Sequence, residues 1–335
     1  MLCQTEPLIR GIDGLDERSS SSSLHAVLDT LFPVTNVPAW EVGMRVLVLG
    51  GTGSIGGPIV RELIRYGHDV VALARSEVSA KKVAESGARP ISGDISRPEP
   101  WLSALPCVDG VIHAAATFAN DEEVADRCLL QHLLPFLSAM PRKTRFVYTG
   151  GCWLFGATNG TVTTEDSPFD PLAFLAWSVS HIRWVLDAPG IEPLVIHPAM
   201  VYEPCGGVFG RFYNDATQRN AVRVVAEAVR WPLVHSEDLA TLYRLALERG
   251  VPGESYLGAA IEGTPVGHIA RAFARRFGTR CPDPVLMSED DIAAELGDWA
   301  QGHARDQRLS GDKARRCLGW EPAHLDPESE IASVP

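Results

Sequence analysis

Apolar runs and amphipathic segments alternate along the chain from residue 45 onward. Strand candidates lie at 45–49, 69–74, 89–92, 108–113, 144–149 and 191–197, and the first of them contains a short apolar run typical of a buried parallel strand. Helical patterns lie between them, at about 58–66, 77–86, 121–140 and 172–187. This alternation predicts an α/β fold, in which a doubly wound parallel sheet carries helices on both faces.

A glycine-rich turn follows the first predicted strand directly. Gly50, Gly53 and Gly56 surround Ser54 and Ile55, and a helical pattern begins soon afterwards. Strand, glycine turn and helix together bring backbone N–H groups and a helix N-terminus up to a pyrophosphate. A glycine motif alone is weak, but here the strand and the helix that it requires are both present. The turn therefore predicts dinucleotide binding.

The ends of the next three predicted strands add candidate coenzyme contacts. Arg75 ends the second strand, where NAD sites usually carry an acidic residue, and an arginine there can pair with the 2′-phosphate of NADP. An exposed arginine at a strand end is the alternative interpretation. Asp94 and Ile95 follow the third strand, with Asp94 suited to the adenine amine or to an ordinary turn. Ala114 and Ala115 follow the fourth strand and would let the coenzyme pass closely.

The flanking regions differ from this pattern. Residues 1–43 include five consecutive serines and are predicted to be a disordered extension, so Met44 is a candidate natural start. Residues 44–197 are expected to form the dinucleotide-binding domain. Residues 198–335 are expected to form mainly a substrate-binding region, with some segments returning to the sheet. Proline and glycine interrupt this region, and its helical patterns lie near 215–229, 237–249, 265–277 and 289–300.

Composition limits the partners. The 335 residues carry a net charge of −12, which argues against nucleic acid or an anionic membrane surface as the main partner. No apolar stretch is long enough for a membrane span. The seven cysteines are scattered and never spaced as Cys-x-x-Cys, which predicts reduced thiols in a cytoplasm, no structural zinc and no metal site. A small-molecule substrate is the expected partner.

Several motifs together resemble the extended short-chain dehydrogenase/reductase superfamily, also called the NAD-dependent epimerase/dehydratase family. Besides the glycine turn, they lie at 93–95, 113–116, 147–156, 197–204, 234–240 and 313–322. The resemblance implies a Rossmann-type fold, bound NAD(P) and redox chemistry at a carbonyl or alcohol. It also implies a coenzyme contact at Pro198 and a possible homodimer through the helices at 121–140 and 172–187.

The catalytic residues of that family are absent from their motif positions. The family uses a Ser or Thr that orients the carbonyl, a Tyr that transfers the proton, and a Lys that holds the ribose. Gly151, Trp177 and His181 stand at these positions. Indole N–H does not ionise usefully, so Trp177 cannot transfer the proton. His181 can, because imidazole titrates near neutral pH. We therefore assign His181 a tentative acid or ribose-holding role, and a backbone-bonded helix histidine is the alternative.

The remaining candidates concern the substrate. Thr149 is the tentative carbonyl-orienting hydroxyl, with Ser178 as a second possibility, and Cys152, Trp153, Trp177 and Phe209 are predicted to line the pocket. Because a missing acid costs about 10²–10⁴-fold in rate, an already polarised carbonyl on an aromatic or polycyclic molecule of specialised metabolism is favoured. The alternatives are an epimerase or dehydratase that recycles its bound NAD, and a non-catalytic dinucleotide sensor.

Overall fold

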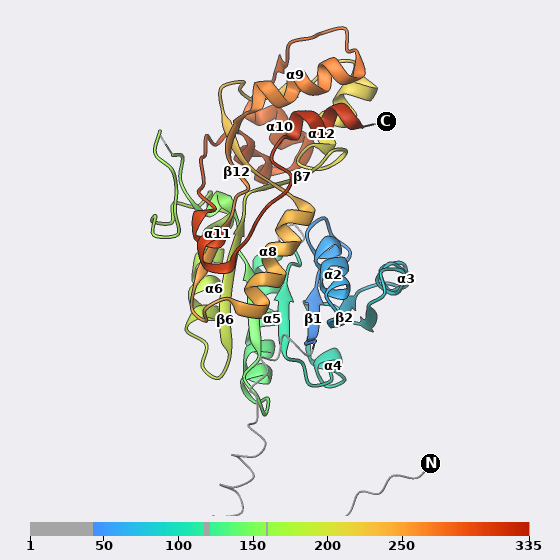
Figure 1. Cartoon of the computed structure of the whole chain (residues 1–335), viewed down its shortest axis with the longest axis vertical. Coiled ribbons are helices and arrows are strands. Elements are labelled where there is room, and N and C mark those ends of the chain that lie inside the picture. The colour runs from blue at the N-terminus through green and yellow to red at the C-terminus, as the bar shows by residue number, and fades with distance from the viewer. Residues whose placement is uncertain (1–42, 117–120, 159, 335) are drawn as a thin grey trace, which may run out of the picture. The chain divides into compact units, whose positions relative to one another are not determined.

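Seven parallel strands form the central sheet of the computed structural model, which describes residues 43–116, 121–158 and 160–334 (Figure 1). Their order across the sheet is β11-β6-β5-β4-β1-β2-β3. The strands are β1 (Arg45–Leu49), β2 (Asp69–Ala74), β3 (Arg89–Ser92), β4 (Gly110–His113), β5 (Arg145–Thr149), β6 (Glu192–Pro198) and β11 (Ser255–Gly258). The predicted parallel sheet is confirmed. The extension predicted over 1–43 lies, except for Gly43, outside the described residues.

The chain winds outward from β1 in both directions. β1 pairs with β2 on one side and with β4 on the other, so the sheet changes direction at this point. Right-handed crossovers then place the two sets of helices on opposite faces, and ligands bind at the carboxyl ends beside such a switch point. The connecting helices are α2 (Gly56–Arg65), α3 (Glu77–Glu85), α4 (Glu99–Leu102), α5 (Glu122–Ser138), α6 (Ala176–Leu186) and α8 (Ser236–Arg249).

Burial on both faces explains the continuous apolar strands. Val46, Leu47, Val48 and Leu49 of β1 are all fully buried, as a central parallel strand requires. Around them, α2 packs against α8, and α5 packs against α6. None of the helices within 43–116, 121–158 and 160–334 is long and apolar enough to cross a membrane.

The C-terminal region adds two small sheets and returns once to the large one. One small sheet has the order β12-β10-β7-β8 and the other pairs β13 with β9. The strands are β7 (Met200–Glu203), β8 (Gly206–Gly207), β9 (Arg223–Val224), β10 (Arg230–His235), β12 (Ile261–Pro265) and β13 (Val285–Leu286). The helices are α7 (Gly210–Asn214), α9 (Val266–Phe277), α10 (Glu289–Leu296), η5 (Asp298–Ala304), α11 (Asp312–Leu318) and α12 (Pro327–Ser333).

Two of the helices predicted in this region are wrong in extent. The one predicted over 215–229 is only a π-helical turn, η4 (Asp215–Arg219), which ends at Asn220 in the left-handed conformation with φ 59°. The chain then enters β9, where the Arg223 N–H donates to the Asp215 carboxylate at 3.1 Å. The helix predicted over 289–300 ends at Leu296, because Gly297 has a φ of 99° that only glycine adopts readily.

Candidate active site

The turn after β1 leaves no room for side chains. Gly50 has a φ of 85°, and a Cβ there would lie 2.5 Å from the Ala114 carbonyl oxygen. A Cβ on Gly56 would lie 2.1 Å from the Gly50 carbonyl oxygen. By contrast, Gly53 and Ser54 are exposed, and the Gly53 N–H closes the turn onto the Gly50 carbonyl at 2.9 Å. The glycines therefore allow a tight turn whose outer side is open to a ligand.

The N-terminus of α2 is left free for an anion. Its cap residue, Ile55, makes no side-chain hydrogen bond, and the first turn contains no acidic residue. The leading N–H groups of a helix point outward with the positive end of its dipole, so they suit a pyrophosphate. The tight turn and this open N-terminus fit a dinucleotide coenzyme, which would be held there by Gly53, Ser54, Ile55 and Gly56.

The other predicted coenzyme residues lie at the same edge of the sheet. Arg75 directly follows β2 and is exposed, with no hydrogen bond or ion pair to any described residue. Asp94 follows β3, and its Oδ1 accepts hydrogen bonds from the Ser96 N–H at 2.9 Å and the Ser96 hydroxyl at 2.8 Å. These bonds lower the pKa of Asp94. Its other carboxylate oxygen has no partner among the described residues.

Small or apolar residues complete this edge. Ile95, Ala114 and Ala115 are half-buried, and Pro198 is buried at the end of β6. The Ala115 N–H donates to His113 Nδ1 at 3.4 Å, which fixes the backbone just beyond β4. Except for His181, which lies on α6, the predicted coenzyme residues thus lie at or just beyond the carboxyl ends of β1 to β4 and of β6.

His181 lies on α6 and is buried against a carboxylate. Its Nδ1 lies 2.6 Å from Oδ2 of Asp126, which belongs to α5. Trp177, one turn earlier on α6, is half-buried and meets the His181 ring edge-on at a centroid distance of 5.0 Å. The α6 residues at the family's Tyr and Lys positions therefore form one aromatic pair beside Asp126.

Asp126 is the functional candidate that sequence reasoning missed. Besides His181, it accepts hydrogen bonds from His113 Nε2 at 2.7 Å and from the Tyr148 hydroxyl at 2.8 Å. Burial alone would raise the pKa of Asp126, but these hydrogen bonds hold it well below its usual range. The only signal in the sequence is that Asp126 is an acidic residue beside Ala125, within a predicted helix that is otherwise largely apolar on its buried face.

The hydroxyl predicted to orient the carbonyl is already engaged. Oγ1 of Thr149 lies 2.6 Å from the hydroxyl oxygen of Tyr243 on α8. Ser178, the other candidate, is buried on α6. Gly151, at the family's serine position, has extended backbone, and a Cβ there would meet no described atom within 4 Å. The serine position thus faces open space and carries no hydroxyl of its own.

The predicted pocket residues separate into half-buried and core positions. Trp153 and Trp177 are half-buried, and Trp153 packs against Phe174 and Trp299. Cys152 is buried, and burial raises the pKa of its thiol to about 12, which fits a packing role. Phe209 is fully buried and lies in the core, with its ring stacked on Tyr202 at 4.6 Å. Of these four predicted pocket residues, only the two tryptophans retain partly exposed side chains.

Three arginines beyond β8 are paired with two carboxylates, those of Asp215 and Glu295. Arg223 donates to Asp215 at 2.8 Å and to Glu295 at 2.8 Å. Arg219 lies 3.3 Å from Asp215 and 3.4 Å from Glu295. Arg211 contacts Asp215 at 3.4 Å. Asp215 is almost fully buried, so it needs this positive charge. The side chains of these arginines are therefore occupied in ion pairs, which link η4 to β9.

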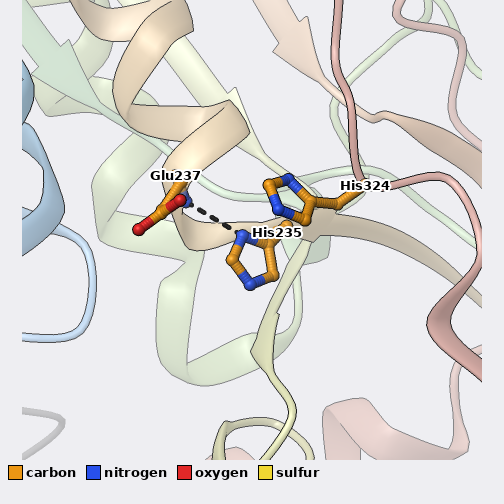
Figure 2. Close-up of side chains that lie close together, drawn as sticks. All are labelled: His235, Glu237 and His324. Carbon is orange, nitrogen blue, oxygen red and sulfur yellow. Dashed lines mark hydrogen bonds between the residues drawn. The ribbon is translucent and has the colours of Figure 1, made fainter. Parts of the chain in front are cut away.

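A cluster of His235, Glu237 and His324 has potential metal-ligand atoms within 4.8 Å of one another (Figure 2). The two imidazole rings stack at 3.9 Å with an angle of 22° between them. His235 Nδ1 accepts the Glu237 N–H at 3.3 Å and so caps α8. Lone pairs in the planes of two stacked rings do not converge on one ion, so the arrangement suits packing better than metal binding.

Comparisons with known proteins identify the family. The family model described as "NAD dependent epimerase/dehydratase family" matches residues 46–257. The dTDP-6-deoxy-L-talose 4-dehydrogenase (NAD(P)(+)) of Kitasatospora kifunensis is 35% identical over 303 residues, which cover 83% of this chain and 91% of that protein. The 4-hydroxy-2-methyl-3-oxo-4-farnesyl-3,4-dihydroquinoline-1-oxide ketoreductase of Stigmatella aurantiaca is 28% identical over 82% of both chains.

Solved structures share the fold. The human epimerase family protein SDR39U1, solved with NADPH, superposes with a TM-score of 0.71 at 19% identity and covers 86% of this chain and 98% of its own. The family model spans most of the described sheet, from β1 to β11, and includes the glycine turn that fits the coenzyme. The chain therefore belongs to the NAD-dependent epimerase/dehydratase family and is an NAD(P)-dependent oxidoreductase.

Proposed function

We propose that this oxidoreductase uses NAD(P)H to reduce an activated carbonyl on a hydrophobic, aromatic or polycyclic small molecule of specialised metabolism. The observation that carries the proposal is the pair on α6, where Trp177 and His181 replace Tyr and Lys beside a turn that fits the coenzyme. The bound coenzyme supplies the hydride, and the protein contributes binding, orientation and a proton. His181 is the titratable residue on α6 available for that proton.

The missing tyrosine favours an activated substrate. Trp177 offers an N–H for hydrogen bonding but no proton that it can transfer. A conjugated or ring-embedded carbonyl delocalises the charge that develops as hydride arrives, so it needs less help from an acid. Epimerisation and dehydration rely more strongly on a Tyr–Lys pair, which makes them the weaker proposals.

The charges near the candidate site favour a hydrophobic substrate over a nucleotide sugar. A sugar diphosphate needs free cations, and Arg211, Arg219 and Arg223 are already paired with Asp215 and Glu295. One relative acts on a dTDP-sugar and another on a dihydroquinoline oxide, so the relatives' names support both classes. The ion-paired arginines and the half-buried tryptophans support the second class, a hydrophobic ring compound.

The function is tested by adding NADPH or NADH to the purified chain with a panel of quinones, polycyclic ketones and dTDP-sugars. We expect turnover with the aromatic and polycyclic ketones, measured as loss of nicotinamide absorbance. Turnover restricted to dTDP-sugars would contradict the substrate class. Coenzyme binding without turnover on any compound would instead indicate a dinucleotide sensor.

We expect Arg75→Ala to weaken NADPH binding by about 10- to 100-fold and to leave NADH binding nearly unchanged. The reason is that the free guanidinium at the end of β2 can pair with the 2′-phosphate, which NADH lacks. Fluorescence titration with both coenzymes measures the effect. Arg89→Ala is the matched control, because Arg89 is engaged with Asp69 at the start of β3. Equal losses for both coenzymes would contradict the proposed preference for NADP.

We expect Gly151→Ser to raise turnover of an unactivated ketone by about tenfold or more. The hydroxyl would occupy the family's carbonyl-orienting position, where a Cβ meets nothing within 4 Å. Steady-state kinetics of Gly151→Ser and Gly151→Ala measure the effect, since both add a Cβ and only serine adds a donor. Equal kinetics in the two variants would show that residue 151 does not reach the substrate.

The proposal includes a cytoplasmic location. None of the six described cysteines forms a disulfide, which supports the location expected from the sequence.

The proposal also includes a homodimer. Val124 on α5 and Trp184 on α6 are exposed, by 68% and 37%, which supports a dimer through these helices. Light scattering of the purified chain tests the dimer.

A further inference from the structure

We propose that Asp126 is a positioning residue that holds His181 with its proton on Nδ1, so that Nε2 is the atom that exchanges a proton with the substrate oxygen. This inference rests on the proposed function. It adds that His181, positioned by Asp126, performs the proton transfer for which the family uses its Tyr–Lys pair.

The geometry leaves Nε2 as the reactive nitrogen of His181. Nδ1 is 2.6 Å from Asp126 Oδ2, and a carboxylate in that position accepts a proton that Nδ1 carries. Nε2 has no hydrogen-bond partner among the described residues. The His181 side chain is 4% exposed, and its ring is held by Asp126 of α5 and by the rings of Trp177 and Trp184 on its own helix. A carboxylate that fixes the tautomer of a histidine is a recurrent way to aim the other nitrogen.

The charge of the cluster is accounted for residue by residue. His113 Nδ1 accepts the Ala115 N–H at 3.4 Å, so Nε2 is the nitrogen of His113 that donates to Asp126. Tyr148 also donates to Asp126, and burial raises its pKa well above the usual value. Glu122, at the start of α5, adds a further negative charge near Tyr148.

Three hydrogen-bond donors surround the buried carboxylate of Asp126. Asp126 is only 5% exposed, and a buried carboxylate is costly unless its oxygens are hydrogen-bonded. The contact with Oδ2 occupies Nδ1 of His181, so Nε2 is the nitrogen of this ring that can exchange a proton with the substrate.

The proton step balances as follows. When hydride reaches the carbonyl carbon, the C=O π pair moves onto the oxygen, and that oxygen takes the Nε2 proton to give the alcohol. His181 is left neutral, with its Nδ1–H still donated to Asp126, and it regains a proton from water. Oxidised coenzyme is the other product.

Nitrogen-15 NMR of histidine-labelled protein tests the inference without turnover. We expect the wild-type His181 signal to show a protonated Nδ1 throughout a titration from pH 5 to 9, with Nε2 as the nitrogen that loses its proton. His181→Gln assigns the signal. A wild-type His181 with an unprotonated Nδ1 at any pH in this range would overturn the inference, even if Asp126 variants fail to fold.

Kinetics of Asp126→Asn provide the second test. We expect kcat to fall by about 10²-fold or more, with less than about threefold change in coenzyme affinity, and the alkaline limb of the pH–rate profile to move to lower pH. In a His181→Gln background, Asp126→Asn should lower kcat only slightly further, because the two residues act as a unit. Full additivity, or an unchanged pH–rate profile, would contradict the role of Asp126.

Asp238→Asn is the matched control. Asp238 is also a buried carboxylate, but it accepts backbone N–H groups from Ala323 and His324 at 2.9 Å, away from α6. We expect it to lower stability and leave the pH–rate profile unchanged. A wild-type protein that binds NADPH and reduces nothing would contradict the proposed function, whereas the NMR result would still decide the state of the Asp126–His181 pair.

Discussion

Gly56→Ala should reduce NAD(P)H affinity by about tenfold or more and lower the free energy of unfolding by about 1–3 kcal/mol. The added methyl would lie 2.1 Å from the Gly50 carbonyl oxygen and 2.6 Å from its carbon, so backbone atoms must move. Neither contact is the flexible end of a side chain, and the strain therefore falls on the turn. Opening the turn would misdirect the N–H groups at the start of α2, which we propose as the pyrophosphate-binding groups.

Gly151→Ala is the control for this change. It adds the same methyl at a position with extended backbone and no described atom within 4 Å, so we expect a stability change of about 0.5 kcal/mol or less. Coenzyme titration and urea denaturation of both variants measure the contrast. If Gly56→Ala binds NAD(P)H as tightly as Gly151→Ala, the turn at 50–56 does not hold the pyrophosphate.

The central sheet could be predicted because its signals are local. β1, β2 and β3 begin and end where the sequence places them. β1 and β2 are short apolar runs between turn residues, whereas β3 (Arg-Pro-Ile-Ser) has only one apolar β-forming residue. The Gly50 and Gly56 positions are also local, because a positive φ or a backbone approach excludes other residues there. These local signals belong to the motif of an NAD(P)-dependent family, which is why the family and its coenzyme could be predicted from sequence alone.

The C-terminal region was less predictable because its strands depend on distant partners. β7 pairs with β10, about thirty residues later in the chain, and β11 returns to pair with β6. Strands this short carry little periodicity of their own. The helix expected over 215–229 failed for a related reason: its Arg223 is held by Asp215 and Glu295, which the sequence alone does not bring together.

The candidate site was only half visible for the same physical reason. Motif position identified Trp177 and His181, but nothing in the sequence joins His181 to Asp126, which lies 55 residues earlier. Thr149 illustrates the opposite error. It occupies a suitable strand end, yet its hydroxyl is engaged by Tyr243 of α8, a contact that only the fold creates.

His197→Leu should make the protein more resistant to acid. His197 lies one residue before the end of β6 and packs against the rings of Phe155 and Phe169, and its buried Nδ1 has no hydrogen-bond partner among the described residues. Burial lowers the pKa of His197 to about 3, so the folded protein resists the protonation that the unfolded chain undergoes near pH 6.5. The contribution of neutral His197 to the free energy of unfolding is fully present above about pH 6.5. It is lost as the pH falls from there toward 3.

One proton taken up on unfolding costs about 1.4 kcal/mol of stability per pH unit, so His197 accounts for about 2 kcal/mol lost by pH 5. Urea denaturation at pH 8 and pH 5 measures the free energy of unfolding of wild type and His197→Leu. Between pH 8 and pH 5 the variant should lose about 2 kcal/mol less than wild type, and the two proteins should differ little at pH 8. His268→Leu, at an exposed position on α9, is the control and should keep the wild-type dependence. Burial of His303 lowers its pKa to about 4, so part of the acid sensitivity should persist in His197→Leu. Identical losses in wild type and His197→Leu would show that His197 is not held neutral in the folded protein.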